Sequence, residues 1–153
     1  TIRGGEWHST VPESVVAEGR LGVFPGESVS NARMAFSEHL KEVSASDSWL
    51  KENPPILEWF EGQFESGKTD VDHAIINKLE MAYKEVNNSS AKIEGVTYGS
   101  DLRLFTNHAD IPSVLFGPGD VRLAHSANEY VKIEEVLTCI KIISNLIINW
   151  CEE

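Results

Sequence analysis

The sequence has few basic residues for its length. Its 153 residues include 13 Lys and Arg against 24 Asp and Glu, which gives a net charge of −11. Proteins that bind the phosphate backbone of nucleic acids use Lys and Arg to displace counterions, and anionic membrane surfaces attract the same side chains. No basic cluster offsets the acidic balance of this chain. The composition therefore argues against nucleic acid or a membrane surface as a partner.

Long hydrophobic runs and cysteines are also scarce. The one long apolar segment, residues 136–150, is interrupted by a Lys and two Asn, and it is too short and too polar to span a bilayer. If this segment is helical, the two cysteines, Cys139 and Cys151, lie about 18 Å apart along its axis. They cannot pair with each other. Two unpaired thiols and the absence of a signal peptide predict a cytoplasmic protein.

The first half of the chain predicts a small α+β unit. Residues 14–23 are rich in Val and small side chains and end at a Pro-Gly turn, which predicts a strand over residues 15–23. A helix capped by Ser28 or Ser30 follows, because apolar residues recur there at spacings of three and four. The aromatic-rich segment 56–64 predicts another strand. Residues 1–3 also predict a strand, and the absence of an initiating Met suggests a chain cut from a larger one.

The second half predicts helices that alternate with strands, which is typical of an α/β sheet. The crossing between the two halves is expected at Ser66-Gly67-Lys68-Thr69. The expected elements are a helix capped by Asp70 or Asp72 and ending at 87–90, strands at 92–96 and 113–116, a short helix at 101–107 between them, and a last helix at 134–150. The last helix is apolar on most sides, so we expect it to be buried in a larger body.

Five short motifs follow one another in a characteristic order. They are Thr10-Val11-Pro12-Glu13, Phe24-Pro25-Gly26-Glu27, Gly99-Ser100-Asp101-Leu102-Arg103, Phe116-Gly117-Pro118-Gly119 and Ala124-His125-Ser126-Ala127-Asn128-Glu129-Tyr130. In this order and spacing they resemble the C-terminal part of the two-zinc amidohydrolases. That family includes acetylornithine deacetylase, succinyl-diaminopimelate desuccinylase, aminoacylase and the glutamate carboxypeptidases. The resemblance covers nearly the whole chain but less than half of a complete member.

The resemblance implies an α/β fold with two parts. Residues 1–67 resemble the later part of an inserted α+β, ferredoxin-like lid domain, and residues 68–153 resemble the C-terminal half of the zinc-peptidase α/β domain. The lid is the usual dimerisation surface of the family. A homodimer is therefore expected, with the strand at 15–23 and the helix at 28–43 as its candidate surface.

His125 is the main candidate for chemistry. It follows Gly119 by six residues, in a loop after a predicted strand, where open α/β folds place their sites. The resemblance implies that it binds one of two zinc ions, for which cobalt can substitute. The alternative is a loop histidine that bonds a backbone carbonyl.

Glu129, Arg103 and Asp101 each have two interpretations. Glu129 comes four residues after His125, so it can orient the imidazole or it can be a capping or solvated carboxylate. Arg103 can anchor a substrate carboxylate through two parallel hydrogen bonds, or it can form a salt bridge to a nearby acid. Asp101 is interpreted as a cap of the short helix rather than a functional group.

The remaining candidates for substrate binding are Gly117 and Gly119, in the Gly-Pro-Gly turn, and His8 and Arg20, in the lid. The turn can cradle a phosphate, but its proline lacks an N–H, so a tight turn beside the active site is favoured. Relatives have an Asn before Val-Pro and an Arg before the Pro-Gly-Glu turn. This chain departs from both, and His8 and Arg20 are the candidates to replace them.

The resemblance also defines what this chain lacks. The other metal ligands of the family, a His-x-Asp, an Asp and a Glu-Glu pair, lie before the lid, and the general base belongs to that pair. One imidazole cannot hold a catalytic zinc ion, which needs about three protein ligands. We therefore expect a parent enzyme that hydrolyses a small N-acyl amino acid or a dipeptide-like amide, and we expect this segment alone to be inactive. The alternative is a non-catalytic ligand-binding or dimerisation module that keeps only the fold.

Overall fold

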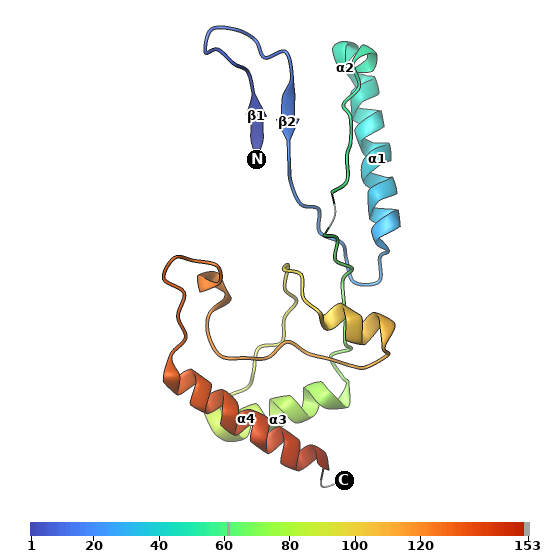
Figure 1. The fold of residues 1–153 in the computed structure, drawn as a ribbon. Coiled ribbons are helices and arrows are strands. Elements are labelled where there is room, and N and C mark those ends of the chain that lie inside the picture. The colour runs from blue at the N-terminus through green and yellow to red at the C-terminus, as the bar shows by residue number, and fades with distance from the viewer. Residues whose placement is uncertain (61, 152–153) are drawn as a thin grey trace.

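The computed structural model describes residues 1–60 and 62–151, and it is extended (Figure 1). A two-stranded hairpin and the helices α1 and α2 lie at one end of the molecule, while α3 and α4 lie at the other. The helices are α1 (Val29–Ser46), α2 (Ser48–Glu52), α3 (Ala74–Asn87) and α4 (Ile133–Cys151), with a π-helical turn η1 (Leu104–His108) and a 3-10 turn η2 (Val121–Leu123). Extended chain connects the two ends.

The hairpin pairs β1 (Ile2–Gly4) with β2 (Val15–Ala17) in antiparallel register, with Ile2 opposite Ala17. The strand predicted at residues 1–3 is therefore essentially confirmed. The strand predicted at 15–23 is correct only for its first three residues. Glu18 still exchanges backbone hydrogen bonds with Thr1, at 2.9 and 2.7 Å, but residues 19–23 have no strand pairing. Every residue from 1 to 22 is exposed, so the hairpin is held by backbone hydrogen bonds rather than by a core.

Side-chain caps define the helices next to the hairpin. Ser28, one of the two predicted caps, accepts a hydrogen bond on Oγ from the backbone N–H of Asn31 at 3.1 Å, and α1 follows it. Asp47 caps α2 in the same way, and the pair Pro54-Pro55 follows the C-cap residue of that helix, Asn53. The returning chain covers part of α1, where the ring of Trp59 meets that of Phe36 edge-on at 5.9 Å.

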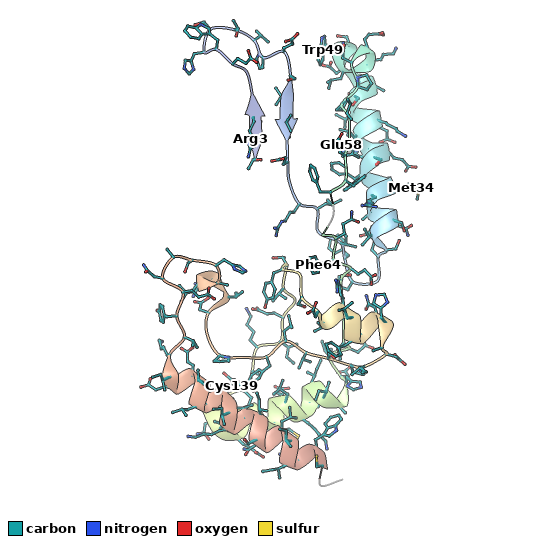
Figure 2. All side chains as sticks on the ribbon, viewed as in Figure 1. Arg3, Met34, Trp49, Glu58, Phe64 and Cys139 are labelled. Carbon is teal, nitrogen blue, oxygen red and sulfur yellow. The ribbon has the colours of Figure 1, made fainter. Side chains whose placement is uncertain are left out.

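α3 and α4 form the main buried contact of the chain. Ile76 and Ala82 of α3 and Cys139 and Ile142 of α4 are buried. Two contacts show that the helices run in roughly opposite directions. The ammonium of Lys78, early in α3, donates to the carbonyl of Asn149, late in α4, at 2.9 Å, and the amide of Asn145, one turn earlier in α4, donates to the carboxylate of Glu85, late in α3, at 3.3 Å. Figure 2 shows Cys139 on α4 where that helix lies against α3.

The ends of α3 and α4 differ slightly from prediction. The cap of α3 is the Nδ1 atom of His73, which accepts from the N–H of Ile75 at 3.2 Å, so the predicted Asp70 and Asp72 caps are wrong. Asn88 ends α3 in the left-handed conformation, with φ of 53°. The last helix is confirmed, and both cysteines are free.

The other predicted strands do not form. The described residues of segments 56–64, 92–96 and 113–116 have no strand pairing, and residue 61 lies outside the described residues. A helix satisfies its hydrogen bonds within one segment, whereas a strand needs a partner from elsewhere in the sequence. At Ser113 the side chain of Thr69 takes the place of a strand partner. Its hydroxyl donates to the carbonyl of Ser113 at 2.6 Å and accepts from the N–H of Ser113 at 2.9 Å.

Much apolar surface is exposed as a result. The chain has an accessible surface of 12780 Å² at 17.0 kDa, whereas a compact protein of that mass exposes about 7,700 Å². On α4 alone the exposed large apolar side chains are Ile133, Leu137, Ile140, Ile143, Ile147, Ile148 and Trp150. The expected burial of this helix is therefore seen on its α3 side only. Among the described helices, none is long and apolar enough to cross a membrane.

Candidate functional site

The Gly-Pro-Gly turn is tied to the first turn of α4. The backbone N–H of Gly119 donates to Oε2 of Glu135 at 3.1 Å, and the φ of Gly119 is 97°, which favours glycine. The N–H of Gly119 is thus engaged by a carboxylate from within the chain. This contact favours the interpretation of a tight turn over that of a phosphate cradle.

An ion pair between Asp120 and Arg122 follows the Gly-Pro-Gly turn. The guanidinium of Arg122 donates from Nε to both carboxylate oxygens of Asp120, at 2.9 and 3.0 Å, and Asp120 also accepts from the backbone N–H of Arg122 at 3.0 Å. These hydrogen bonds, the side-chain ones first, lower the pKa of Asp120 from its ordinary value of 3.8 to about 2. The guanidinium of Arg122 is therefore already bonded to the carboxylate of Asp120.

His125 lies in the loop between η2 and α4. Its φ is 61°, a left-handed conformation in which histidine is enriched among non-glycine residues. Its backbone N–H donates to Oε2 of Glu129 at 3.1 Å, and turn hydrogen bonds join Ser126 to Leu123 and Glu129 to Ser126. The loop is closed around His125, whose side chain is exposed.

Glu129 thus bonds the backbone of His125, and no contact between its carboxylate and the imidazole is found in the described residues. Residues 124–128 form turns and a bend rather than the helical turn that would align positions i and i+4. The carboxylate fixes the backbone from which the imidazole projects. Its predicted role in orienting a metal ligand remains a prediction.

His125 is the one described residue that the sequence predicts as a metal ligand. His125 suits such a ligand, because its imidazole is accessible and its backbone is fixed. Within residues 1–60 and 62–151, however, no three His, Cys, Asp or Glu side chains converge in a group that could hold an ion. A catalytic zinc site needs about three protein ligands, so the described chain cannot complete one.

Arg103 lies just before η1, and its guanidinium stacks on an aromatic ring. Its Cζ lies 4.6 Å from the ring centroid of Phe64, and its Nη1 is shielded from solvent without a hydrogen-bond partner in the described structure. Neither predicted interpretation of Arg103 anticipated this stacking. The guanidinium keeps one donor for an acceptor that the described residues do not provide.

Asp101 is the predicted cap of the short helix, but the side chain that bonds the backbone at its start belongs to Ser100. The side-chain hydroxyl of Ser100 accepts from the N–H of Leu102 at 3.3 Å, while Asp101 contributes its backbone carbonyl, which accepts from the N–H of Leu104 at 2.9 Å. The predicted short helix becomes the π-helical turn η1, whose closing bond joins the N–H of Ala109 to the carbonyl of Leu104.

The lid candidates lie in the hairpin region. His8 is in the loop between β1 and β2, with its ring centroid 6.3 Å from that of Trp7, and Arg20 is exposed on the extended chain after β2. No contact in the described residues joins either side chain to His125 or Arg103. The structure therefore forms three separate pairs, Gly119 with Glu135, His125 with Glu129 and Arg103 with Phe64, but among the described residues it does not bring the candidate side chains into one site.

Sequence reasoning missed the junction beside Arg103. The amide of Asn107 donates from Nδ2 to Oε2 of Glu65 at 2.9 Å and to the carbonyl of Ser66 at 3.0 Å, and Nε2 of His108 lies 3.3 Å from the same Glu65 oxygen. The hydrogen bond from Asn107, followed by the charge of His108, lowers the pKa of Glu65. An aromatic residue just before a predicted crossing was the available signal.

Comparison with known proteins places this arrangement in a family. Residues 10–149 match Peptidase family M20/M25/M40. The chain belongs to this family of metallopeptidases and amidohydrolases, as the order of its motifs predicted. No solved structure matches it.

Two relatives align with almost the whole chain. An N-formyl-4-amino-5-aminomethyl-2-methylpyrimidine deformylase of Bacillus subtilis is 32% identical, and one of Halalkalibacterium halodurans is 27% identical, each over 98% of this chain. An acetylornithine deacetylase of Myxococcus xanthus is 33% identical over 38% of the chain and 15% of its own length. The chain spans 37% of the length of each of the two deformylases.

Proposed function

We propose that this chain is the C-terminal part of a metal-dependent amidohydrolase that removes an acyl group from a small N-acyl amine. The observation that carries the proposal is the family match over residues 10–149, supported by relatives that align with 98% of the chain and are named as deformylases. The family match also supports the coarser expectation of an enzyme acting on amides.

An N-formyl aminomethylpyrimidine is the first substrate to test. The deformylases match the full chain, whereas the acetylornithine deacetylase matches a 58-residue segment. The expectation of an N-acyl amino acid or a dipeptide-like substrate therefore becomes the second candidate. The two classes differ in chemistry, because the formylated pyrimidine carries no carboxylate and the acyl amino acid does.

His125 is proposed as one ligand of a zinc pair, with cobalt as a possible substitute. When bound, zinc polarises the amide carbonyl and lowers the pKa of bound water to about 7. The task of this chain is to present the imidazole, and two contacts support it: Glu129 fixes the backbone N–H of His125, and Glu135 fixes the turn before it. The remaining ligands and the general base are proposed to lie in the part of the protein that this chain does not span.

Arg103 is proposed to bind the substrate. Its guanidinium, stacked on Phe64, can donate to the carboxylate of an acyl amino acid, or to the formyl oxygen or a ring nitrogen of a formylated pyrimidine. Arg122, by contrast, is held by Asp120. Gly117 and Gly119 are proposed to shape the wall of the site, while His8 and Arg20 remain proposed lid contacts.

A comparison of substrates with the full-length protein tests the proposal. We expect hydrolysis of N-formyl-4-amino-5-aminomethyl-2-methylpyrimidine, with release of formate, to exceed hydrolysis of N-acetylornithine. A protein loaded with zinc that cleaves neither compound, nor any other small N-acyl amine, would return the chain to the alternative of a non-catalytic module.

The division at residues 67 and 68, and a homodimer formed through the first part, also remain proposals. The exposed hairpin and α1 are available for such a contact, since their burial within the chain is slight. Sedimentation of the full-length protein at micromolar concentration is expected to give the mass of a dimer, and a monomer would contradict it.

A further inference from the structure

The segment that crosses between the two halves of the chain lies against Arg103. A Cβ at Gly67 would be 2.6 Å from Cδ2 of Leu102 and 2.9 Å from Cα of Arg103. Real Cβ atoms essentially never come so close to backbone atoms, so only glycine allows this approach. Residue 67 thereby brings its neighbours to the Arg103 backbone.

Asn107 fastens the same segment. Its side-chain amide bonds both the carboxylate of Glu65 and the carbonyl of Ser66, at 2.9 and 3.0 Å. His108 adds a contact to Glu65 from the next position. The residues that follow Phe64 are therefore held on η1, the turn that Arg103 precedes.

The ring of Phe64 occupies the space that a side chain at Gly99 would fill. A Cβ at Gly99 would lie 2.9 Å from Cγ of Phe64 and 3.1 and 3.2 Å from its Cδ atoms. Figure 2 shows Phe64 at the junction of the two halves, beside the loop that leads to η1. The ring therefore lies between a side-chain-free residue and the guanidinium of Arg103, 4.6 Å from its centroid.

From these contacts we infer that Phe64 is a positioning residue: it fixes the plane of the Arg103 guanidinium, so that N–H donors along the guanidinium edge meet an acceptor on the substrate. Stacking on an aromatic face leaves the edge of a guanidinium, where its N–H donors lie, available for hydrogen bonds. This inference rests on the proposed function, because it requires Arg103 to bind substrate. It also makes the crossing segment part of the substrate site.

Steady-state kinetics on the full-length, zinc-loaded protein test the role. Phe64→Leu keeps an apolar side chain but removes the ring, and we expect KM to rise roughly three- to tenfold while kcat changes less than twofold. Phe64→Tyr keeps the ring and should restore KM to the wild-type value. In an Arg103→Ala background, Phe64→Leu should add nothing, which a purely structural role of the ring would not predict.

Two glycines provide an independent test that leaves Phe64 in place. Gly99→Ala puts a methyl group against the ring and should raise KM as Phe64→Leu does. Gly95→Ala is the matched control, because a Cβ there meets nothing within 4 Å, and it should have no effect.

The outcomes separate the two claims. If the wild type is active and Phe64→Leu has an unchanged KM, or lowers kcat and melting temperature with KM constant, the positioning role is wrong and the proposed function stands. If the Phe64→Leu effect persists undiminished without Arg103, the inference is also overturned. If the wild type hydrolyses no N-acyl amine, the proposed function fails, and the positioning role fails with it.

Discussion

Residues 1–52 and residues 68–151 both contain well-capped helices, but they differ in what those helices bury. In the first region the hairpin is exposed throughout, and α1 buries one apolar residue, Ala32, along its 18 residues. In the second region α3 and α4 bury four residues between them, with Ile142 at 2% exposure. One region is organised by local hydrogen bonds, and the other also has a small core.

The difference teaches where tertiary structure in this chain originates. α3 and α4 can pack because two amphipathic helices need only each other. A sheet needs several strands before it has a face to cover α1, and the described residues form two short ones. In the second region the loops that carry Gly119 and His125 are also held by side-chain carboxylates, from Glu135 and Glu129.

The largest effect is expected at His125. In the full-length protein, His125→Ala should lower bound zinc and reduce kcat at least about a hundredfold, since even residues one shell away from a metal contribute up to that much. His8→Ala, in the first region, should leave zinc content unchanged and alter KM only a few-fold. An intact zinc content in His125→Ala would show that His125 does not hold the metal, and an equal loss in His8→Ala would show that the first region holds it as well.

A stability comparison on one helix tests the core. Ile142→Ala should lower the free energy of unfolding by about 2–5 kcal/mol, because it leaves a cavity between α3 and α4. Ile140→Ala is the matched control, since Ile140 is two residues away on α4 and 54% exposed, and its effect in the 153-residue chain should be well below 1 kcal/mol. Urea denaturation measures both, and equal effects would mean that the contact between the helices is not the core of this region.

Two arginines, one from each region, test substrate binding. Loss of a hydrogen bond to a charged group costs roughly 1.5–3 kcal/mol, so Arg103→Ala should raise KM about ten- to a hundredfold with little change in kcat. Arg20→Ala should have a smaller effect, because no contact in the described structure fixes its side chain. A larger change at Arg20 would move the substrate anchor into the first region.

The smallest effect is a local titration. Because hydrogen bonds from Arg122 lower the pKa of Asp120 from 3.8 to about 2, the contribution of this pair is complete above pH 3.8 and is lost as the pH falls through about 2. Arg122→Gln should return the pKa of Asp120 toward 3.8, as NMR titration of its carboxyl carbon would show. A wild-type value already near 3.8 would contradict the bidentate contact.

Features that depend on neighbouring residues could be predicted from the sequence. The cap at Ser28 and the end of α3 at Asn88 follow from residues that act within one turn, and the extent of α4 follows from its continuous apolar segment. The cap at His73 was missed because imidazole is an unusual acceptor in that position, and two aspartates nearby looked more suitable. The motif order predicted the family, which the match over residues 10–149 bears out.

Features that depend on distant residues could not be predicted. Whether segments 92–96 and 113–116 become strands depends on partners, and period and composition do not reveal whether partners are present. The stacking of Phe64 on Arg103 joins positions 39 residues apart through glycines at 67 and 99, and those glycines have no helix or strand pattern of their own. The assembly of the candidate site also depends on residues far apart in the sequence, so it could not be predicted either.

Metal dependence of the full-length protein is the most direct test of the central claim. Zinc content and release of formate from N-formyl-4-amino-5-aminomethyl-2-methylpyrimidine would be measured before chelation, after chelation, and after zinc is added back. We predict that activity falls with the bound zinc and returns with it, in proportion to occupancy. Hydrolysis that continues unchanged in metal-free protein would contradict the account.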